Sequence, residues 1–241
     1  MDFAFMRDTF WTLLSGVPLT LNLAFTAVAL GAVLAMLLAL MRISGNRVLD
    51  WIARAYVFVF RGSPLLVQIF LIYYGLGQFR PALQEIGLWG FFREPYWCAI
   101  LALTLNTAAY AGEIIRGGFQ AVPAQQVEAA RACGMSGLLL FRRIIFPIAL
   151  RQALPAYGSE LILMVKATSL ASIITMMEVT GLAAKLISQT FRAVEVFVVA
   201  GLIYLILNFL ITRVIMALEW WLSPHLRRPP AITLPVEAAH V

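Results

Sequence analysis

The chain has 241 residues, of which 62% are hydrophobic and only 12% are charged, and its mean hydropathy is +0.88. Because a soluble domain carries about 25% charged residues, this composition excludes a soluble globular protein and predicts an integral membrane protein. The net charge of +6 does not indicate a nucleic-acid surface. The basic residues lie between apolar runs, a pattern typical of charges that set membrane topology.

The N-terminal part contains an uncharged run over residues 9–41, longer than the roughly 20 residues that one span needs. The excess predicts a periplasmic or interfacial N-terminus over residues 1–16 and a break at Gly16-Val17-Pro18. Later uncharged runs predict further spans, and a proline-containing tail over residues 221–241 is predicted to be disordered. The predicted all-α membrane domain, residues 17–220, has five spans, near residues 19–41, 62–79, 95–115, 156–180 and 196–217.

The distribution of Lys and Arg predicts the orientation of these spans. The loops 42–61 and 116–151 hold four and five basic residues, with one acidic residue each. The N-terminal segment and the loops 80–94 and 181–195 together carry five basic and five acidic residues. The positive-inside rule therefore predicts a periplasmic N-terminus and a cytoplasmic C-terminus.

The stretch over residues 127–147 reads VEAARACGMSGLLLFRRIIFP and lies between the third and fourth predicted spans. It is too polar for a span and too apolar for a random loop. Two alanines after Glu128 let a partner surface approach closely, and Gly134 supplies a turn that ends a short helix. The simpler interpretation is a common helical composition that ends at a glycine.

The spacing resembles the EAA loop of ABC-transporter permeases, E-A-A-x3-G-x9-I-x-L-P, with Phe146 in place of the usual Leu. In that family the loop, here residues 124–147, forms a short cytoplasmic coupling helix that docks on the ATPase subunit. The resemblance implies that the coupling residues are Glu128, Ala129, Ala130, Gly134, Arg142, Arg143 and Pro147.

Further stretches narrow the resemblance to the polar amino-acid uptake permeases of bacteria. They are FRGSPLLVQ (60–68), LNTAAYAGEIIRGG (105–118), ALPAYGSELILMVKATSLAS (153–172) and VTGLAAKLIS (179–188). The chain resembles the histidine/opine type, and within it the M subunits of octopine and nopaline permeases. This resemblance implies a type I importer fold in the bacterial inner membrane. It also implies three kinds of partner, namely two ATPase subunits, a second and paralogous permease subunit, and a periplasmic substrate-binding protein.

The sequence contains no set of residues for catalysis. It has no G-x4-G-K-[ST] phosphate loop, so ATP and Mg²⁺ are expected on the partner ATPase and no cofactor is expected in this chain. Both histidines, His225 and His240, lie in the tail, so we expect neither a metal site nor a Ser-His-Asp set. The chain is therefore predicted to be a translocation subunit and not an enzyme.

Ionisable residues inside the predicted spans are candidates for substrate contact because each costs about 2.5–3.5 kcal/mol to insert. For Glu113, an ion pair with Arg116 at the end of the helix is the better explanation. Glu178 is expected near the outer end of the fourth span, in contact with water. Glu160 and Lys166 are six residues apart, so they point about 120° away from each other on a helix and cannot pair directly.

We hypothesise that Glu160 binds the positive group of the substrate. Lys166 is equally well explained as a contact to the substrate carboxylate or as a structural contact. Ser63 is a further candidate, because Pro64 leaves a backbone carbonyl without its helical donor and Ser63 offers a hydroxyl. A proline at the first turn of a helix explains the same pair. Asn106 is interpreted as a contact between helices.

The alternative function is an ATP-independent secondary transporter or channel subunit, which explains the spans but not the spacing of the EAA loop. An intramembrane enzyme would need paired Asp or a Ser/His pair inside the spans, and the sequence has neither. The predicted spans contain three acidic residues, Glu113, Glu160 and Glu178, and one basic residue, Lys166. This excess of negative charge favours a cationic or zwitterionic ligand. The residues do not identify which amino acid or opine is carried, nor whether the second permease subunit is a copy of this chain.

Overall fold

The computed structural model describes residues 2–222, and all regular elements in that range are helical. Three helices are long and apolar enough to cross a membrane: α2 (Val17–Ile43), α8 (Pro95–Gln120) and α13 (Ala193–Leu222). Two bent pairs meet the same criteria when each pair is taken together, so the described residues contain between three and five spans. The first pair is α3 (Arg47–Gly62) with Leu65–Gln78, and the second is Gly137–Ile174 with α12 (Val179–Thr190).

The remaining elements are shorter helices and local changes of helix type. They are α1 (Phe3–Leu14), α4 (Leu65–Phe70), the π-helix η1 (Leu71–Gly75), α5 (Leu76–Gln78), α6 (Arg80–Glu85), α7 (Trp89–Phe92), α9 (Ala124–Ala132), α10 (Gly137–Leu140), the π-helix η2 (Phe141–Ile145), α11 (Phe146–Ala167) and the 3-10 helix η3 (Thr168–Ile174).

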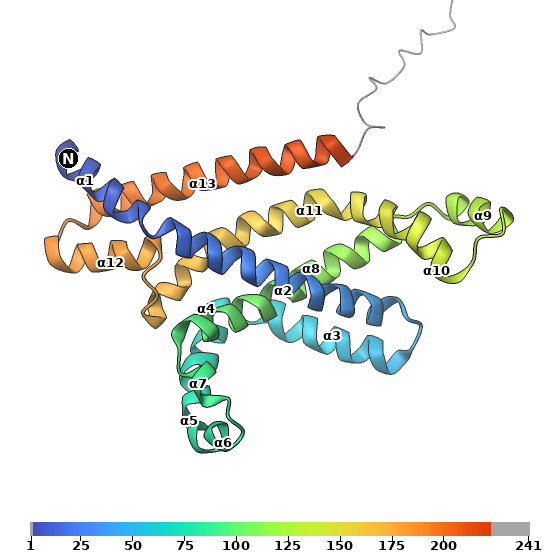
Figure 1. Cartoon of the computed structure of the whole chain (residues 1–241), viewed down its shortest axis with the longest axis horizontal. Coiled ribbons are helices and arrows are strands. Elements are labelled where there is room, and N and C mark those ends of the chain that lie inside the picture. Colours follow the sequence, from blue (N-terminus) through green and yellow to red (C-terminus); the bar gives the residue numbers. More distant parts are fainter. Residues whose placement is uncertain (1, 223–241) are drawn as a thin grey trace, which may run out of the picture.

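The long helices lie side by side, with α8 packed against both α2 and α11 (Figure 1). Small residues allow these close approaches. A Cβ atom added at Gly118 of α8 would lie only 2.6 Å from the carbonyl oxygen of Ala149 in α11. The helices α9 and α10 lie at the same end of the molecule as the turn between α2 and α3, and α1 and α12 lie at the opposite end (Figure 1).

Two apolar clusters form most of the core. The larger one joins α2, α8 and α11, and includes the fully buried side chains Leu23, Leu103 and Val165. The second joins α1, α12 and α13 around Leu13 and Val196. This second cluster holds the N-terminal helix α1 against the C-terminal part of the membrane domain.

The N-terminal helix is also fixed by the residue that precedes it. Asp2 caps α1 by accepting hydrogen bonds from the backbone N–H groups of Ala4 and Phe5, and it forms an ion pair with Arg192 at 3.1 Å. The hydrogen bond from the Phe5 backbone and the bond from Arg192 hold the pKa of Asp2 below its ordinary value. Arg192 also lies over the Phe5 ring, at 4.8 Å from its centroid.

Three of the predicted spans agree with single helices. The ranges 19–41, 95–115 and 196–217 fall inside α2, α8 and α13, and the predicted break at Gly16 lies between α1 and α2. The predicted tail 221–241 lies outside the described residues, except for its first two residues, which end α13.

The other two predicted spans do not form single straight helices. The range 62–79 is preceded by α3, which extends through Arg61 to Gly62, and the chain then turns by 102° at Ser63-Pro64. Pro64 has no N–H and cannot continue the helix, which accounts for this turn. In the range 156–180, α11 is followed directly by the 3-10 helix η3. Thr175 comes after the last residue of η3, and its φ of 66° ends this helical segment before α12 begins.

Candidate functional site

The stretch predicted as a coupling loop forms a short helix at one end of the molecule. Glu128 and Ala129 are exposed on α9, whereas Ala130 is buried against the rest of the chain. Gly134 has a φ of +80°. The N–H of Gly134 donates a hydrogen bond to the carbonyl of Arg131, and the N–H of Met135 donates one to the carbonyl of Ala130. These two bonds form a Schellman motif, so Gly134 ends the helix as predicted.

The chain then returns to α11 through an exposed apolar and basic segment. Leu138 is 79% exposed, and Arg142 and Arg143 are exposed on the π-helix η2. Pro147 follows in the first turn of α11. A proline lacks an N–H, and in an α-helix its ring collides with the carbonyl four residues earlier. The wider turn of the π-helix η2 before Pro147 leaves room for the proline ring.

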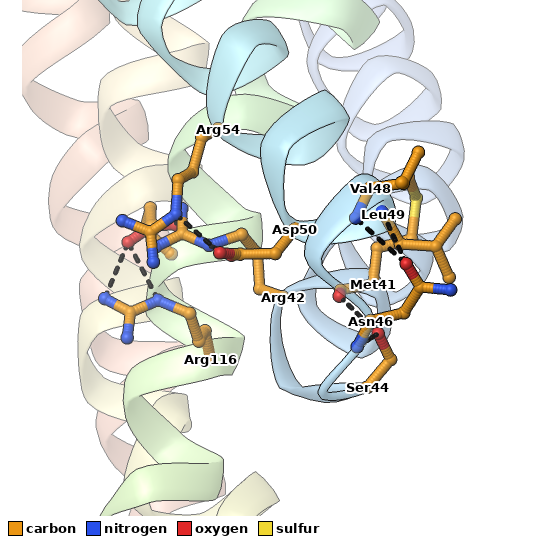
Figure 2. Close-up of polar contacts among 10 residues, drawn as sticks. Met41, Arg42, Ser44, Asn46, Val48, Leu49, Asp50, Arg54 and Arg116 are labelled. Carbon is orange, nitrogen blue, oxygen red and sulfur yellow. Dashed lines mark hydrogen bonds and ion pairs between the residues drawn. The ribbon is translucent and has the colours of Figure 1, made fainter.

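An ion-pair network ties the turn between α2 and α3 to α8 at this same end (Figure 2). Arg42 of α2 pairs with Asp50 of α3 at 2.9 Å and with Glu113 of α8 at 2.7 Å. Arg54 pairs with Asp50 at 2.8 Å, and Arg116 pairs with Glu113 at 2.7 Å. The predicted ion pair between Glu113 and Arg116 is therefore confirmed. The network stabilises the part of α8 that leads into α9.

A second polar region lies where α8 and α11 cross. Glu160 is 6% exposed, and the hydroxyl of Thr107 donates a hydrogen bond of 2.9 Å to its carboxylate. Lys166 lies on an exposed face of α11. As expected from their spacing, Glu160 and Lys166 do not pair.

The turn at Pro64 leaves the carbonyl of Phe60 without its helical donor, as predicted, and side chains replace that donor. The amide of Gln68 donates to the Phe60 oxygen at 2.9 Å and to the hydroxyl of Ser63 at 2.9 Å. Asn106 of α8 donates to the same Phe60 oxygen at 3.3 Å and to Gln68 Oε1 at 3.0 Å. Asn106 thus joins α8 to the α3–α4 turn, which confirms its interpretation as a contact between helices.

This polar junction yields a prediction for Gln68. Its replacement with Met keeps the length of the side chain but leaves the Phe60 carbonyl and the Asn106 amide with fewer partners. We expect a loss of about 1–3 kcal/mol of stability, measured as a lower Tm of the purified protein. Gln84→Met is the matched control because Gln84 is exposed on α6. Equal Tm values for the two variants would contradict the assigned role of Gln68.

A cavity of about 270 Å³ lies against these helices. Asn106 and Tyr110 of α8 line it together with Glu160 of α11, and the rest of its lining is Leu163, Met164 and Ala167. The guanidinium of Arg61 lies over the ring of Tyr110, 4.9 Å from its centroid. The structure therefore brings Glu160 and Asn106 to one cavity and places Lys166 outside its lining.

The expectation that Glu178 is in contact with water is wrong. Its side chain is fully buried and caps α12 by accepting hydrogen bonds from the N–H groups of Thr180, at 2.9 Å, and Gly181, at 2.8 Å. The hydroxyl of Tyr204 in α13 donates a third bond at 2.7 Å. Glu178 is a structural residue that orients α12 against α13.

Sequence reasoning missed Arg61, Gln68 and Tyr110. Arg61 interrupts an apolar run in the sequence, and in the structure it belongs to the last turn of α3. Gln68 follows Pro64 by four residues, and this spacing places an amide within reach of the freed carbonyl. Nothing in the local sequence indicates that Tyr110 meets Arg61. Among residues 2–222, no group of three or more His, Cys, Asp or Glu side chains could hold a metal ion.

Comparison with known proteins agrees with this arrangement. The nopaline transport system permease protein NocM of Agrobacterium fabrum is 57% identical over 238 residues, which cover 99% of each chain. The octopine transport system permease protein OccM of Rhizobium meliloti is 60% identical over 227 residues, covering 94% of this chain and 92% of the relative. A crystal structure of an amino acid ABC transporter with histidines has a TM-score of 0.80 at 35% identity, and covers 91% of this chain and 98% of that one.

The family of binding-protein-dependent transport system inner membrane components matches residues 11–223. This match covers all of the long helices, the α9 region and the cavity. It confirms the resemblance found in the sequence and the all-helical fold of a type I importer membrane domain. The chain is a multi-pass inner-membrane protein and belongs to the family of binding-protein-dependent transport system inner membrane components.

Proposed function

We propose that this chain forms part of the translocation path of an ATP-driven importer for a cationic or zwitterionic polar amino acid or opine. The observation that carries this assignment is the buried carboxylate of Glu160, which lines a cavity and accepts a hydrogen bond from the hydroxyl of Thr107. A buried carboxylate is costly, and a cationic substrate group offsets that cost when it binds. The similar permeases for nopaline and octopine support the opine class.

The partners follow from the family and from the exposed helix α9. Two ATPase subunits would bind ATP and Mg²⁺ and would dock on α9 around Glu128 and Ala129. A second permease subunit, a paralogue of this chain, would complete the wall of the path. A periplasmic binding protein would deliver the substrate. Five spans are proposed, with the two bent pairs counted as one span each.

The orientation is proposed with the N-terminus in the periplasm and the C-terminus in the cytoplasm. Its support is the distribution of arginines around the α9 end of the molecule. Arg42 lies in the last turn of α2, Arg47 and Arg54 lie in the first half of α3, and Arg131, Arg142 and Arg143 lie between α8 and α11. The positive-inside rule places this end in the cytoplasm.

The mechanism couples α9 to the helices on either side of it. Closure of the ATPases around ATP would push on α9, and this movement would reach α8 directly and α11 through α10 and η2. Both of these helices line the cavity at Glu160, so their rocking would change the side from which the cavity is open. The ion-pair network around Arg42 would keep the turn between α2 and α3 moving with α8.

The test is a pull-down of the tagged chain from detergent-solubilised membranes, with and without the substitution Glu128→Arg. We expect a P-loop ATPase to be recovered with the unmodified chain and to be lost from the variant, because the substitution places a cation where an acid faces the partner. A second permease in the same preparation would identify the other membrane subunit.

Glu85→Arg is the matched control, since Glu85 is an exposed acid on α6, far along the chain from α9. This variant is expected to retain the ATPase. If the unmodified chain recovers no ATPase, the role of α9 is refuted and the ATP-independent transporter becomes the better explanation.

A further inference from the structure

A second cavity lies between α2, α8 and α11, and it shares no lining residue with the cavity at Glu160. Its volume is about 240 Å³, and its lining follows three turns of α11, from Phe146 to Tyr157. Ala32 of α2 and Phe119 of α8 belong to the other two walls. Because Phe119 lies in the last turn of α8 and Phe146 begins α11, this apolar cavity lies toward the α9 end of the molecule (Figure 1).

The apolar cavity offers one polar group, the hydroxyl of Tyr157. The other lining side chains are those of alanine, leucine, isoleucine, methionine and phenylalanine. The Tyr157 hydroxyl donates a hydrogen bond of 3.2 Å to the carbonyl of Val28 in α2, so its proton is already engaged. A cavity without several convergent polar groups holds no ordered water but accepts hydrocarbon. The apolar cavity therefore fits a hydrocarbon ligand and not a polar amino acid.

The shape of the apolar cavity fits a single chain. The rings of Phe119 and Phe146 both pack on Phe141, at centroid distances of 5.8 and 5.9 Å, and form a wall at the α9 end. Leu150 lines the cavity and is 47% exposed, so the cavity opens at the surface of α11. A volume of about 240 Å³ along about 16 Å of α11 is far narrower than an α-helix, which is about 10 Å wide. An acyl chain of the bilayer fits this space, whereas a helix of a second protein does not.

Exposed arginines follow the same stretch of chain as the mouth of the apolar cavity. Arg151 comes directly after Leu150 in α11, and Arg142 and Arg143 lie about two turns earlier in η2. Among residues 2–222, none of these three arginines forms an ion pair, unlike Arg42 at the same end of the molecule. Basic pockets between spans on the cytoplasmic side attract anionic lipid headgroups. The charge beside the mouth therefore favours an anionic lipid over a neutral one.

We propose that the apolar cavity binds one acyl chain of an anionic phospholipid and that Arg151 binds the phosphate of the same lipid. The planar guanidinium matches two phosphate oxygens through parallel N–H bonds. This inference goes beyond the proposed function and uses it only for the orientation, which places the α9 end at the cytoplasmic leaflet. A chain in the cavity contacts Phe119 of α8 and Phe146 of α11, so the lipid lies where a movement of α9 reaches both helices.

The test is photocrosslinking of the purified importer complex in phosphatidylcholine nanodiscs that contain a trace of probe lipid. The two probes are phosphatidylglycerol and phosphatidylcholine, each with a diazirine in one acyl chain, and mass spectrometry locates the labelled residues. We expect labelling within residues 146–157, about fivefold stronger from the phosphatidylglycerol probe, as for one arginine near a membrane surface. Residues 202–210 of α13 include exposed apolar side chains and report contact with the bulk bilayer, which is expected to be equal for both probes.

Two pairs of variants separate the acyl chain from the headgroup. Ala32→Phe fills the cavity from α2 and is expected to reduce labelling of residues 146–157 by both probes about 10-fold, because the chain loses its buried methylene groups. Its matched control is Ala29→Phe, since Ala29 is exposed on the same helix and does not line the cavity. Arg151→Gln is expected to lower labelling by the phosphatidylglycerol probe about fivefold and to leave the phosphatidylcholine probe unchanged. Arg47→Gln removes an exposed arginine of α3 and is expected to change neither.

The possible results each have one meaning. If residues 146–157 of the unmodified complex are labelled no more than residues 202–210, the lipid site is refuted, and a second permease subunit that covers the mouth would give this result. Equal labelling of Ala32→Phe and Ala29→Phe would place the chain outside the cavity. If both probes label the unmodified complex equally, the assignment of Arg151 is overturned.

Size-exclusion chromatography shows whether each variant assembles. If Ala32→Phe does not, Leu154→Trp fills the same cavity from α11 and takes its place, with the same expected loss of labelling. The labelling requires neither ATP nor an amino acid. Failure of this proposal is therefore distinguishable from failure of the proposed transport function.

Discussion

Glu160→Gln is expected to abolish transport while the complex still assembles. Gln has nearly the same shape as Glu and can still accept the 2.9 Å hydrogen bond from Thr107, so the crossing of α8 and α11 is preserved. What the variant loses is the negative charge at the cavity. A charge-assisted bond contributes about 1.5–3 kcal/mol, and its loss removes the preference of the cavity for a cationic group.

The measurement is uptake of radiolabelled L-arginine or octopine into proteoliposomes that contain the complete importer and its binding protein. Size-exclusion chromatography and basal ATP hydrolysis report assembly in the same preparation, and both are expected to match those of the unmodified complex. Glu85→Gln removes an exposed acid on α6 and serves as the control with normal uptake. Normal uptake by Glu160→Gln would end the proposal that this carboxylate faces the path.

Glu178→Ala is expected to destabilise the fold more than any other substitution of an acid in the described chain. The side chain is fully buried and accepts bonds from Thr180, Gly181 and Tyr204. Alanine leaves two backbone N–H groups and one hydroxyl without their acceptor in an apolar region. The expected cost is about 3 kcal/mol or more, because each buried unsatisfied group costs about 1–3 kcal/mol.

The measurement is the Tm of the detergent-purified chain, followed by fluorescence-detected size-exclusion chromatography after heating. Tyr204→Phe removes one of the three bonds to Glu178 and the bond between the Tyr204 and Thr180 hydroxyls, but it keeps the cap of α12, so its Tm is expected to fall less than that of Glu178→Ala. Glu128→Ala removes an exposed acid and is expected to leave the Tm unchanged. If Glu178→Ala and Glu128→Ala melt at the same temperature, the structural role of Glu178 is refuted.

The two acids Glu160 and Glu178 illustrate the limit of sequence reasoning inside spans. Both occur in similar apolar surroundings, and hydropathy marks both as costly. One lines a cavity and the other caps a helix, and this difference depends on Thr107 and Tyr204, which lie on other helices. The substrate hypothesis for Glu160 stays a prediction, whereas the expectation that Glu178 contacts water was wrong.

Pro64 and Pro147 show a similar limit for helix boundaries. The sequence predicts that a proline disturbs a helix, because the missing N–H is a local property. It does not predict that the chain turns by 102° at Pro64 and passes through a π-helix before Pro147. The first outcome depends on amide donors from Gln68 and Asn106, and Asn106 comes from α8.

The sequence by itself determined the class of the protein, the positions of α2, α8 and α13, and the short helix that ends at Gly134. Each of these depends on neighbours along the chain, namely the length of an apolar run or a glycine at a fixed spacing. Only the tertiary structure decided which polar residues share a cavity. Asn106 and Tyr110 of α8 line it together with Glu160 of α11, and no local pattern encodes contacts among side chains so far apart in the sequence.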